Sequence, residues 1–514
     1  MEKKQVRNSK TYYSIQKMDE FMMQYAFLFS LITLFFAWFL SKKLFMPNIA
    51  KKNLPPSPPK LPIIGNLHQL GSLPHRSLRF LAQKHGPLML LHFGSTPVLV
   101  VSSADAAREC KTHDLDLAYR PKVEILEQIS YNMKSLISSP YGEYWRQARS
   151  IFVHQLLSKR KVQSFNVLIK EEISLLMNKL KESSPVINLS LMFTSLSNDV
   201  ICRSAFGRKY IDTEAGKKFV RVMSEGQELL TNFSIGEFVP WLSWINILNG
   251  LNYRTDMVLK QGDKFLDELI QEHLSKTSHE SKENFLDILL NIYNDNIAGV
   301  SIDMDGIKAL IKDVFGAGTE TTSAFLEWTM TELLRHPTIM KKLQSEVREI
   351  LHDKQDITFD DLERMHYLKA VIKETFRYQP PVPLIPREAG RDVKIMGYDI
   401  AAGTIVMINA LAIGRDPLFW DEPENFKPER FLNSSIDFKG FHFQHIPFGS
   451  GRRICPGIGF ATALIELVLA NILHKFDWEL PGGAKGEDLD TTELRGLTVC
   501  RKNPLLAVAI PRDF

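Results

Sequence analysis

The sequence predicts a fold in which long helices are combined with a smaller number of strands. Three stretches carry this prediction. Residues 460–473 form an apolar run without a clearly polar face, which is typical of a buried helix. Between residues 307 and 333 apolar side chains recur at helical spacing, and Pro337 marks a place where a helix is expected to stop. Residues 88–93 and 98–101 are apolar runs separated by a Gly-Ser-Thr-Pro turn, so they predict a pair of strands.

Composition places the chain among ordinary globular proteins. It has 514 residues, of which 44% are hydrophobic, and its formal net charge of +4 gives no indication of nucleic-acid binding. Its four cysteines, at positions 110, 202, 455 and 500, are too far apart in sequence for a zinc motif and too few for a disulfide framework. We therefore expect a reducing compartment for the main body and no nucleic-acid partner.

The N-terminal region predicts a membrane anchor. Residues 21–40 carry no charged side chain, and a helix of this length spans about 30 Å, the thickness of one bilayer core. A buried core helix would show a clearer polar face, and a cleaved signal peptide would have a shorter apolar core. Lysines on both sides of the segment compete in setting its orientation, and those at positions 42, 43, 51 and 52 favour a cytosolic body.

These features divide the chain into four expected parts. Residues 1–20 are a polar extension, residues 21–41 the transmembrane anchor, residues 42–62 a basic and proline-rich hinge, and residues 63–514 the main body. The prolines of the hinge predict a stiff, extended connector.

The main chemical motif is a single cysteine within a loop of glycines and arginines at residues 447–457. Pro456 suits the first turn of the apolar helix that follows, so Cys455 is predicted at a helix N-terminus. Free backbone N–H groups, the macrodipole and the neighbouring arginines favour a thiolate there, and a thiolate is a soft, anionic metal ligand. The alternative interpretation is a buried cysteine beside a glycine turn.

The spacing Phe-x-x-Gly-x-Arg-x-Cys-x-Gly resembles the haem-binding loop of the cytochrome P450 superfamily. Phe448, Gly451, Arg453, Cys455 and Gly457 fill its five fixed positions. The resemblance implies that Cys455 is the axial thiolate ligand of haem b and that the other four residues bind the cofactor. It also implies a mainly α fold with a smaller β-rich region, in which haem lies between two central helices.

Two further segments resemble parts of the same family that hold haem. Trp145 and Arg149 are four residues apart, so they share one face of a helix, and they resemble the family's Trp-Arg-x-x-Arg, which binds a haem propionate. By the same resemblance Arg387, after a proline-rich stretch, points at a propionate. Without the resemblance, Trp near Arg is commonly surface packing.

Residues 317–322, Ala-Gly-Thr-Glu-Thr-Thr, lie within the predicted central helix and resemble the family's oxygen-binding element. The resemblance implies that Thr321 holds dioxygen or its water and that Glu320 feeds protons inward, so both are catalytic candidates. Glycine inside a helix costs about 1 kcal/mol relative to alanine, which close approach to a flat ligand would offset. The alternative is a kinked helix with a solvated Glu320.

A structural triad is the third element that the resemblance implies. Glu374 and Arg377 are three residues apart on a predicted helix, as a neighbouring ion pair. With Arg430 they resemble the family's buried triad on the side of the haem loop, so structural roles are expected for all three. The chain departs from the family pattern at Tyr378-Gln379 and at Leu411, and neither departure affects the iron chemistry.

An apolar substrate pocket is expected from an early loop, the central helix, a proline-rich segment and the C-terminal region. The candidate lining residues are Val123, Ile125, Leu126, Ile129, Phe315, Ala317, Val382, Leu384, Ile385 and Leu497. Residues 238–244 form a separate apolar and aromatic patch. This patch is interpreted either as core packing or as a lip that dips into a membrane, since Trp prefers the interface.

The resemblance extends from Leu54 to the C-terminus and is closest to the plant A-type group, with similarity to psoralen synthase-like enzymes. It implies a membrane-bound haem-thiolate monooxygenase that uses O2 and NADPH-derived electrons. The implied substrate is a lipophilic plant specialised metabolite: a coumarin, a terpenoid or an indole alkaloid. The implied partners are NADPH-cytochrome P450 reductase and, as a further candidate, cytochrome b5.

The implied location is the endoplasmic reticulum membrane, with a single-pass anchor and a cytosolic catalytic domain at residues 63–514. Two other functions stay open at this point. One is a haem-thiolate dehydratase or isomerase that consumes no O2. The other is a non-catalytic haem- or lipid-binding protein.

Overall fold

A computed structural model of the chain describes residues 52–183, 185–210, 213–231, 235–275, 284–294, 302–354 and 356–512, together with residues 23, 25, 26, 29, 30, 32–34 and 37. The chain divides into two compact units, Met1–Asn53 and Leu54–Phe514. The described residues between 23 and 37 are helical and exposed. The expected extension at residues 1–20, the rest of the expected anchor and the first part of the hinge lie outside the described residues.

The expected hinge packs closely at its C-terminal end. Pro55 and Pro58 are buried, and the Leu90 N–H donates to the Pro56 carbonyl over 2.8 Å. The Asn66 amide donates to the Pro59 carbonyl over 3.2 Å. Because these proline carbonyls are used as acceptors, the second unit begins at Leu54, before the expected boundary at residue 63.

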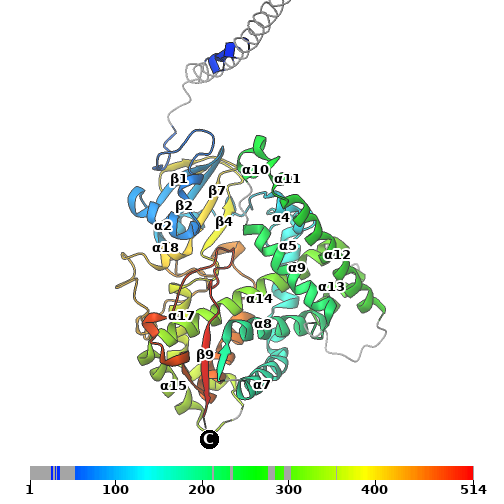
Figure 1. The fold of residues 1–514 in the computed structure, drawn as a ribbon, viewed down its shortest axis with the longest axis vertical. Helices are drawn as coiled ribbons and strands as arrows, with labels where there is room; N and C mark the ends of the chain where they lie inside the picture. Colours follow the sequence, from blue (N-terminus) through cyan, green and yellow to red (C-terminus); the bar gives the residue numbers. More distant parts are fainter. Residues whose placement is uncertain are drawn as a thin grey trace, which may run out of the picture. The chain divides into compact units, whose positions relative to one another are not determined.

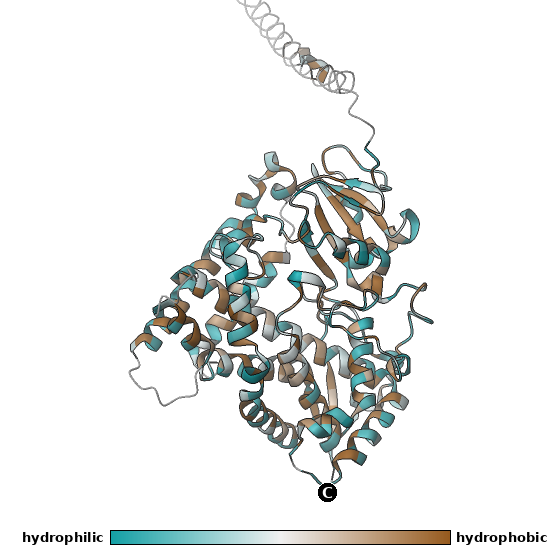
Figure 2. Cartoon of the chain, turned by 180° about the vertical axis from the view of Figure 1, so that it is seen from behind, coloured by the Kyte–Doolittle hydropathy of each residue, from teal (hydrophilic) through white to brown (hydrophobic). Residues whose placement is uncertain are grey.

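A four-stranded sheet lies at one end of the second unit (Figure 1), in the order β1-β2-β7-β4. β1 (Leu88–Phe93) pairs antiparallel with β2 (Thr96–Val101), as the sequence predicts, with Phe93 opposite Thr96. β7 (Ile405–Asn409) pairs parallel with β2 and antiparallel with β4 (Leu384–Glu388). The strands of this sheet are strongly hydrophobic (Figure 2), because both faces are covered within the unit.

A long central helix, α14 (Met304–Arg335), runs across the middle of this unit (Figure 1) and packs against α8 (Leu189–Phe206). The Asp303 carboxylate accepts the Gly306 N–H over 2.9 Å and caps the N-terminus of α14. α14 ends at Arg335, and Pro337 begins α15 (Pro337–Leu351). The predicted stop is therefore confirmed.

The predicted apolar helix is α19 (Ile458–Lys475), which packs with α14, α15 and α17 (His366–Tyr378). Among the described residues, α19 is the one helix long and apolar enough to cross a membrane. Its apolar side chains, from Phe460 to Leu473, belong to the main hydrophobic core. Burial on all sides explains why the sequence shows no polar face here.

A further group of helices packs together, and one of them, α9 (Glu214–Thr231), contacts α14. α9, α12 (Leu251–Ser275) and α4 (Glu124–Ile129) pack together, and α10 (Ile235–Phe238) and α11 (Ile245–Leu248) follow α9 in the chain. The fold is mainly α with a smaller β region, as expected.

The other described helices and strands are short or peripheral. The helices are α2 (Pro74–His85), α3 (Ala104–Thr112), α5 (Glu143–Ser150), the π-helix η2 (Ile151–Leu156), α6 (Lys159–Ser164), α7 (Asn166–Glu182), α13 (Phe285–Asn294), α16 (Phe359–Arg364) and α18 (Ala410–Gly414), with the 3-10 turns η1 (Leu67–Gln69), η3 (Pro240–Leu242), η4 (Pro428–Phe431), η5 (Gly451–Arg453), η6 (Pro481–Gly483) and η7 (Gly486–Asp488). The strands are β3 (Val186–Asn188), β9 (Leu506–Pro511) and β8 (Phe476–Glu479) in one sheet, and β5 (Val393–Ile395) with β6 (Tyr398–Ile400) in another.

Candidate active site

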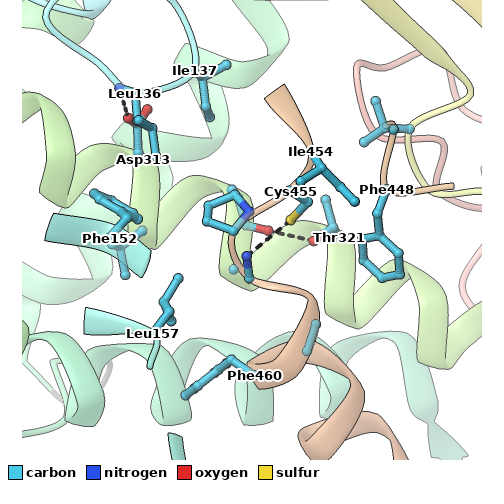
Figure 3. A pocket seen from close by; sticks show the side chains of 18 of the residues that line it. Leu136, Ile137, Phe152, Leu157, Asp313, Thr321, Phe448, Ile454, Cys455 and Phe460 are labelled. Carbon is cyan, nitrogen blue, oxygen red and sulfur yellow. Dashed lines mark hydrogen bonds between the residues drawn. The ribbon is translucent and has the colours of Figure 1, made fainter. Parts of the chain in front are cut away.

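A cavity of about 310 Å³ lies between α14, the first turns of α19 and the loop at residues 447–457. Its wall is mostly apolar, and a single cysteine, Cys455, faces it (Figure 3). The other three cysteines are not among its lining residues. Residues far apart in the sequence therefore line one cavity together with a single cysteine.

Backbone groups hold Cys455 in place. Its N–H donates to the Phe448 carbonyl over 3.0 Å, and its Sγ accepts the Gly457 N–H over 3.3 Å. Gly451 has a φ of +70°, and a Cβ there would lie 2.0 Å from a carboxylate oxygen of Asp114, so only glycine fits. The loop thus needs glycine at position 451 for its conformation.

The protonation of Cys455 differs from the expectation of a thiolate in the protein alone. Burial raises the pKa of Cys455, and the Gly457 N–H and Arg149 only partly oppose it. Arg453 does not act on the sulfur, because its guanidinium donates to the carbonyls of Ala118 and Leu136. A cation bonded directly to the sulfur would supply the missing stabilisation, since a coordinating thiol is deprotonated.

Four arginines gather around one side of the site. Arg120, Arg149 and Arg453 line the cavity. Arg387 does not line it: its guanidinium donates to the Ser450 carbonyl over 2.6 Å and lies 3.9 Å from Asp114, while its Nε is buried without a hydrogen-bond partner.

These arginines carry more positive charge than their surroundings neutralise. Burial, together with repulsion from Arg387 and Arg149, lowers the pKa of Arg453 to about 9. Burial likewise lowers the pKa of Arg120, again with repulsion from Arg387 and Arg453. Such a cluster is suited to an anionic ligand. The role of Arg120 was not predicted, because Tyr-Arg-Pro at positions 119–121 carries no distinctive motif.

Trp145 lines the cavity beside Arg149, on the face of α5 that the four-residue spacing predicts. Its indole N–H donates to the Leu136 carbonyl over 3.1 Å, and the Arg453 guanidinium lies 4.4 Å from its ring centroid. Trp145 therefore supports Arg453 through a cation–π contact as well as forming part of the wall.

The central helix contributes Thr321 but not Glu320 to the wall. The Thr321 hydroxyl donates to the Ala317 carbonyl over 2.6 Å (Figure 3). Burial raises the pKa of Glu320, and a hydrogen bond with the Thr498 side chain opposes that shift. Glu320 thus lies towards the C-terminal segment, outside the cavity lining.

The sequence suggested that a flat ligand packs against the glycine of residues 317–322. In the structure that glycine, Gly318, packs against a side chain of α8. A Cβ on Gly318 would lie 2.5 Å from Cδ1 of Ile201 on α8. Gly318 therefore allows the close packing of α8 on α14, and this contact offsets its helix cost. Gly318 and Ile201 both line the cavity, so the packing also shapes the wall.

The expected substrate-pocket residues are divided by the structure. Ala317, Val382 and Ile385 line the cavity. The residues that do not line it are Val123, Ile125, Leu126, Ile129, Phe315, Leu384 and Leu497.

Packing explains three of these differences. Ile125 of α4 packs against α9 and α12 instead of facing the cavity. Phe315 stacks edge-on against Phe219, with ring centroids 4.9 Å apart. Leu497 is 47% exposed.

Two irregular segments supply some of the wall positions that the sequence did not indicate. Leu136 and Ile137 precede α5, Phe152 lies in the π-helix η2, and Leu157 follows it directly. The Leu157 N–H donates to the Phe152 carbonyl over 2.8 Å, a five-residue bond. This wider turn brings Phe152 and Leu157 to the same face, whereas α-helical spacing would separate them by well over a quarter turn.

The predicted triad is assembled and buried. Arg377 Nε and Glu374 Oε2 are 2.7 Å apart with both side chains fully buried, and Arg430 Nε is 3.2 Å from Glu374 Oε1. Arg377 also donates to the Gly414 and Asn425 carbonyls. The triad thus ties α17 to the segment that leads towards the cysteine loop.

Comparison with known proteins identifies the family. The family model described as Cytochrome P450 matches residues 55–508. The chain belongs to the cytochrome P450 family. Its relatives include cytochrome P450 736A117 of Prunus mume, which is 56% identical over 490 residues, covering 93% of this chain and 94% of the relative.

Some relatives of this P450 have names that state an activity. Psoralen synthase of Ammi majus is 50% identical over 498 residues, covering 96% of this chain and 99% of its own. Tabersonine/lochnericine 19-hydroxylase of Catharanthus roseus is 49% identical over 474 residues, covering 90% and 94%. A solved zebrafish cytochrome P450 with abiraterone has a TM-score of 0.72 and 26% identity, and covers 86% of this chain and 99% of that one. The expected resemblance to plant P450 enzymes is confirmed.

This P450 is a monooxygenase, and its family carries haem on a cysteine thiolate with electrons supplied by a reductase. The described residues fit that cofactor. They contain no cluster of three or more His, Cys, Asp or Glu side chains able to hold a metal ion. One cysteine in an apolar cavity therefore suits a metal that arrives with its other ligands in a macrocycle, and the arginine cluster suits that macrocycle's carboxylates.

Proposed function

We propose that Cys455 is the axial thiolate of haem b in this P450, and that the cavity oxidises a lipophilic plant specialised metabolite with O2 and electrons from NADPH. The observation that carries the proposal is the position of Cys455: it is the cysteine of the cavity, at one wall of an apolar space whose other wall is α14. Bound haem supplies the activation of dioxygen, and the chain supplies binding, orientation and protons.

The residues around the site receive distinct roles in this proposal. Arg120, Arg149 and Arg453 hold the haem carboxylates, and Trp145 supports Arg453 from its ring face. Arg387 acts through its bond to the Ser450 carbonyl. Phe448, Gly451 and Gly457 hold the cysteine loop, and Thr321 holds a proton or water at its hydroxyl. Glu320 is a proton reservoir one layer away, because it reaches Thr498 and not the cavity.

The substrate class is supported by the apolar wall and by two relatives. Val382, Ile385, Ala317 and Ile137 give the substrate side of the wall an aliphatic character. The named activities of the relatives are psoralen synthesis and hydroxylation of tabersonine or lochnericine at position 19. A coumarin, a terpenoid or an indole alkaloid fits this character, and a screen of such compounds by type I spectral shift and product analysis would choose among them.

Substitution of the cysteine tests the cofactor assignment. Cys455→Ser should abolish the haem-thiolate spectrum of the reduced, carbon monoxide-bound protein, because oxygen cannot replace the soft anionic ligand. Cys110→Ala, Cys202→Ala and Cys500→Ala serve as controls and should keep that spectrum. A normal haem-thiolate spectrum in Cys455→Ser would contradict the proposal.

We further propose a single-pass anchor at residues 21–41 in the endoplasmic reticulum membrane, with the body in the cytosol beside NADPH-cytochrome P450 reductase and cytochrome b5. The uncharged segment supports it, and so does the 238–244 patch with the residues that follow. Phe238 and Val239 are core residues, whereas Trp241, Trp244 and Leu248 are 63%, 53% and 76% exposed. The two interpretations of this patch thus apply to different residues.

The membrane proposal is tested with a chain that lacks residues 1–41. It should keep residual binding to lipid vesicles, and Trp241→Ser/Trp244→Ser should remove most of that binding because Trp partitions to the interface. Leu418→Ser, at an 84% exposed position outside the patch, is the matched control. Truncated protein that binds no vesicles, with or without the Trp substitutions, would contradict a membrane-dipping lip.

A further inference from the structure

A half-buried carboxyl group in the cavity wall has no part in the function proposed above. Asp313, on α14, lines the cavity two turns before Thr321, and its Oδ2 accepts the Leu136 N–H over 2.6 Å (Figure 3). A buried carboxylate is costly unless hydrogen-bonded. The hydrogen bond from Leu136 therefore offsets part of the cost of placing Asp313 in the wall. It also joins α14 to a segment almost 180 residues away in sequence.

That segment is a single hydrogen-bonded turn at residues 135–139, which we call the 135–139 turn. The Ser139 N–H donates to the Ser135 carbonyl over 2.9 Å, and the N–H groups of Ile137 and Ser138 each reach the Ser135 hydroxyl over 3.1 Å. Leu136, Ser138 and Ser139 are buried. The N–H groups of a helical turn point to one end and its carbonyls to the other, so Asp313 serves the N–H end.

The carbonyl end of the 135–139 turn holds the cationic side of the cavity. The Leu136 carbonyl accepts both the Trp145 indole N–H over 3.1 Å and the Arg453 guanidinium over 3.2 Å. The Ile137 carbonyl accepts Arg120 Nε over 3.0 Å, and the Ser139 carbonyl accepts Arg453 as well. Three cavity side chains are thus oriented by one turn.

We infer that Asp313 is a positioning residue for the haem site: it fixes the 135–139 turn against α14, and the turn fixes Trp145, Arg120 and Arg453. The inference rests on the proposed function only in its last step, where those three side chains meet the cofactor. Asp313 bonds the backbone of the turn, and the Cys455 sulfur is bonded by the Gly457 N–H instead. Its action passes through backbone groups, so it depends on an acceptor oxygen at this position.

The experiment compares three variants of the haem-loaded full chain. Asp313→Ala removes the acceptor, Asp313→Asn keeps one acceptor oxygen, and Asp263→Ala is the matched control. Asp263 also ties this part of the chain to a neighbouring element, through the Tyr131 hydroxyl over 2.9 Å, but makes no contact with the turn. Should Asp313→Ala fail to fold, Ser135→Ala tests the same turn, because it removes the hydroxyl that accepts two of its N–H groups.

Two readouts separate the steps. Hydrogen exchange of the amides at residues 136–138 should speed up about five- to a hundredfold in Asp313→Ala, because the buried Leu136 N–H loses its acceptor. Haem transfer to an acceptor globin should also accelerate, and Asp313→Asn should restore most of both properties. Ser135→Ala should show a smaller increase in the same amides.

Three results would overturn the inference. They are unchanged exchange at residues 136–138 in Asp313→Ala, no recovery in Asp313→Asn, or an equal effect in Asp263→Ala. Faster exchange with unchanged haem transfer would overturn the link from the turn to the cofactor side chains. None of these outcomes affects Cys455, whose spectrum is tested separately, so the two proposals can fail independently.

Discussion

Two polar networks of similar composition stabilise this P450 in different ways. The Glu374 network consists of Glu374, Arg377 and Arg430, and its carboxylate and Arg377 are fully buried. The Asp263 network joins Asp263 and Asp267 of α12 to Lys308 of α14 and the Tyr131 hydroxyl. Its two carboxylates are 43% and 54% exposed.

The carboxylates of the two networks differ in burial, and this difference decides how much stability is lost when one partner is removed. In the Glu374 network every lost partner leaves a charge in a medium of low dielectric constant, where water cannot replace it. In the Asp263 network water is available to each carboxylate, so a lost partner is replaced at little cost. We conclude that the side of the cysteine loop is held rigidly and that the contact between α12 and α14 tolerates change.

The largest expected effect is at Glu374. Glu374→Ala should destabilise the protein by about 3–5 kcal/mol, because it leaves Arg377 buried without its carboxylate. The chemical denaturation midpoint and the yield of haem-loaded protein measure this. Glu374→Gln is the conservative control and should lose less, since the amide oxygen still accepts one hydrogen bond. A denaturation midpoint for Glu374→Ala within error of the parent would contradict the role of this network.

The contrast between the networks also explains what the sequence could reveal. The cysteine loop and the Glu374–Arg377 pair consist of residues close in sequence, so their spacing could be matched to motifs of a known family, and the resemblance implied their roles. The chain's helix α14 and its end before Pro337 follow from periodicity and from proline geometry. These parts were predicted because local rules and the final structure agree.

The cavity wall could not be predicted in the same way, because tertiary contacts decide it. Tyr131, Asn132 and Met133 have φ values of +52°, +57° and +63°, a conformation that non-glycine residues adopt only when their surroundings impose it. The π-helix η2 and the 135–139 turn likewise could not be predicted from the spacing of apolar residues in an α-helix. Ile125 was assigned to the pocket for its apolar character, but α9 and α12 offer it an apolar partner on the other side.

The next effect concerns turnover and not stability. Thr321→Ala should leave the fold intact, because the hydroxyl bonds only the Ala317 carbonyl one turn earlier. It should raise the peroxide released per NADPH and lower the product formed per NADPH, because the hydroxyl that is proposed to hold a proton or water is lost. Thr321→Ser keeps a hydroxyl and should preserve most of the coupling. Equal coupling ratios in Thr321→Ala and the parent protein would remove Thr321 from the proton path and favour chemistry without O2.

The smallest effect is expected at the Asp263 network, and it sharpens the comparison with Glu374. Asp263→Ala removes the partner of Tyr131 and one of the two carboxylates beside Lys308, but Asp267 still pairs with Lys308. The free energy of unfolding should therefore change by less than about 1 kcal/mol, because both carboxylates are open to water and the buried Lys308 ammonium keeps Asp267 as its partner. Added salt should shrink this difference further, because it screens exposed charges and leaves the buried Glu374 network unaffected. A loss in Asp263→Ala as large as that in Glu374→Ala, independent of salt, would show that burial does not separate the two networks.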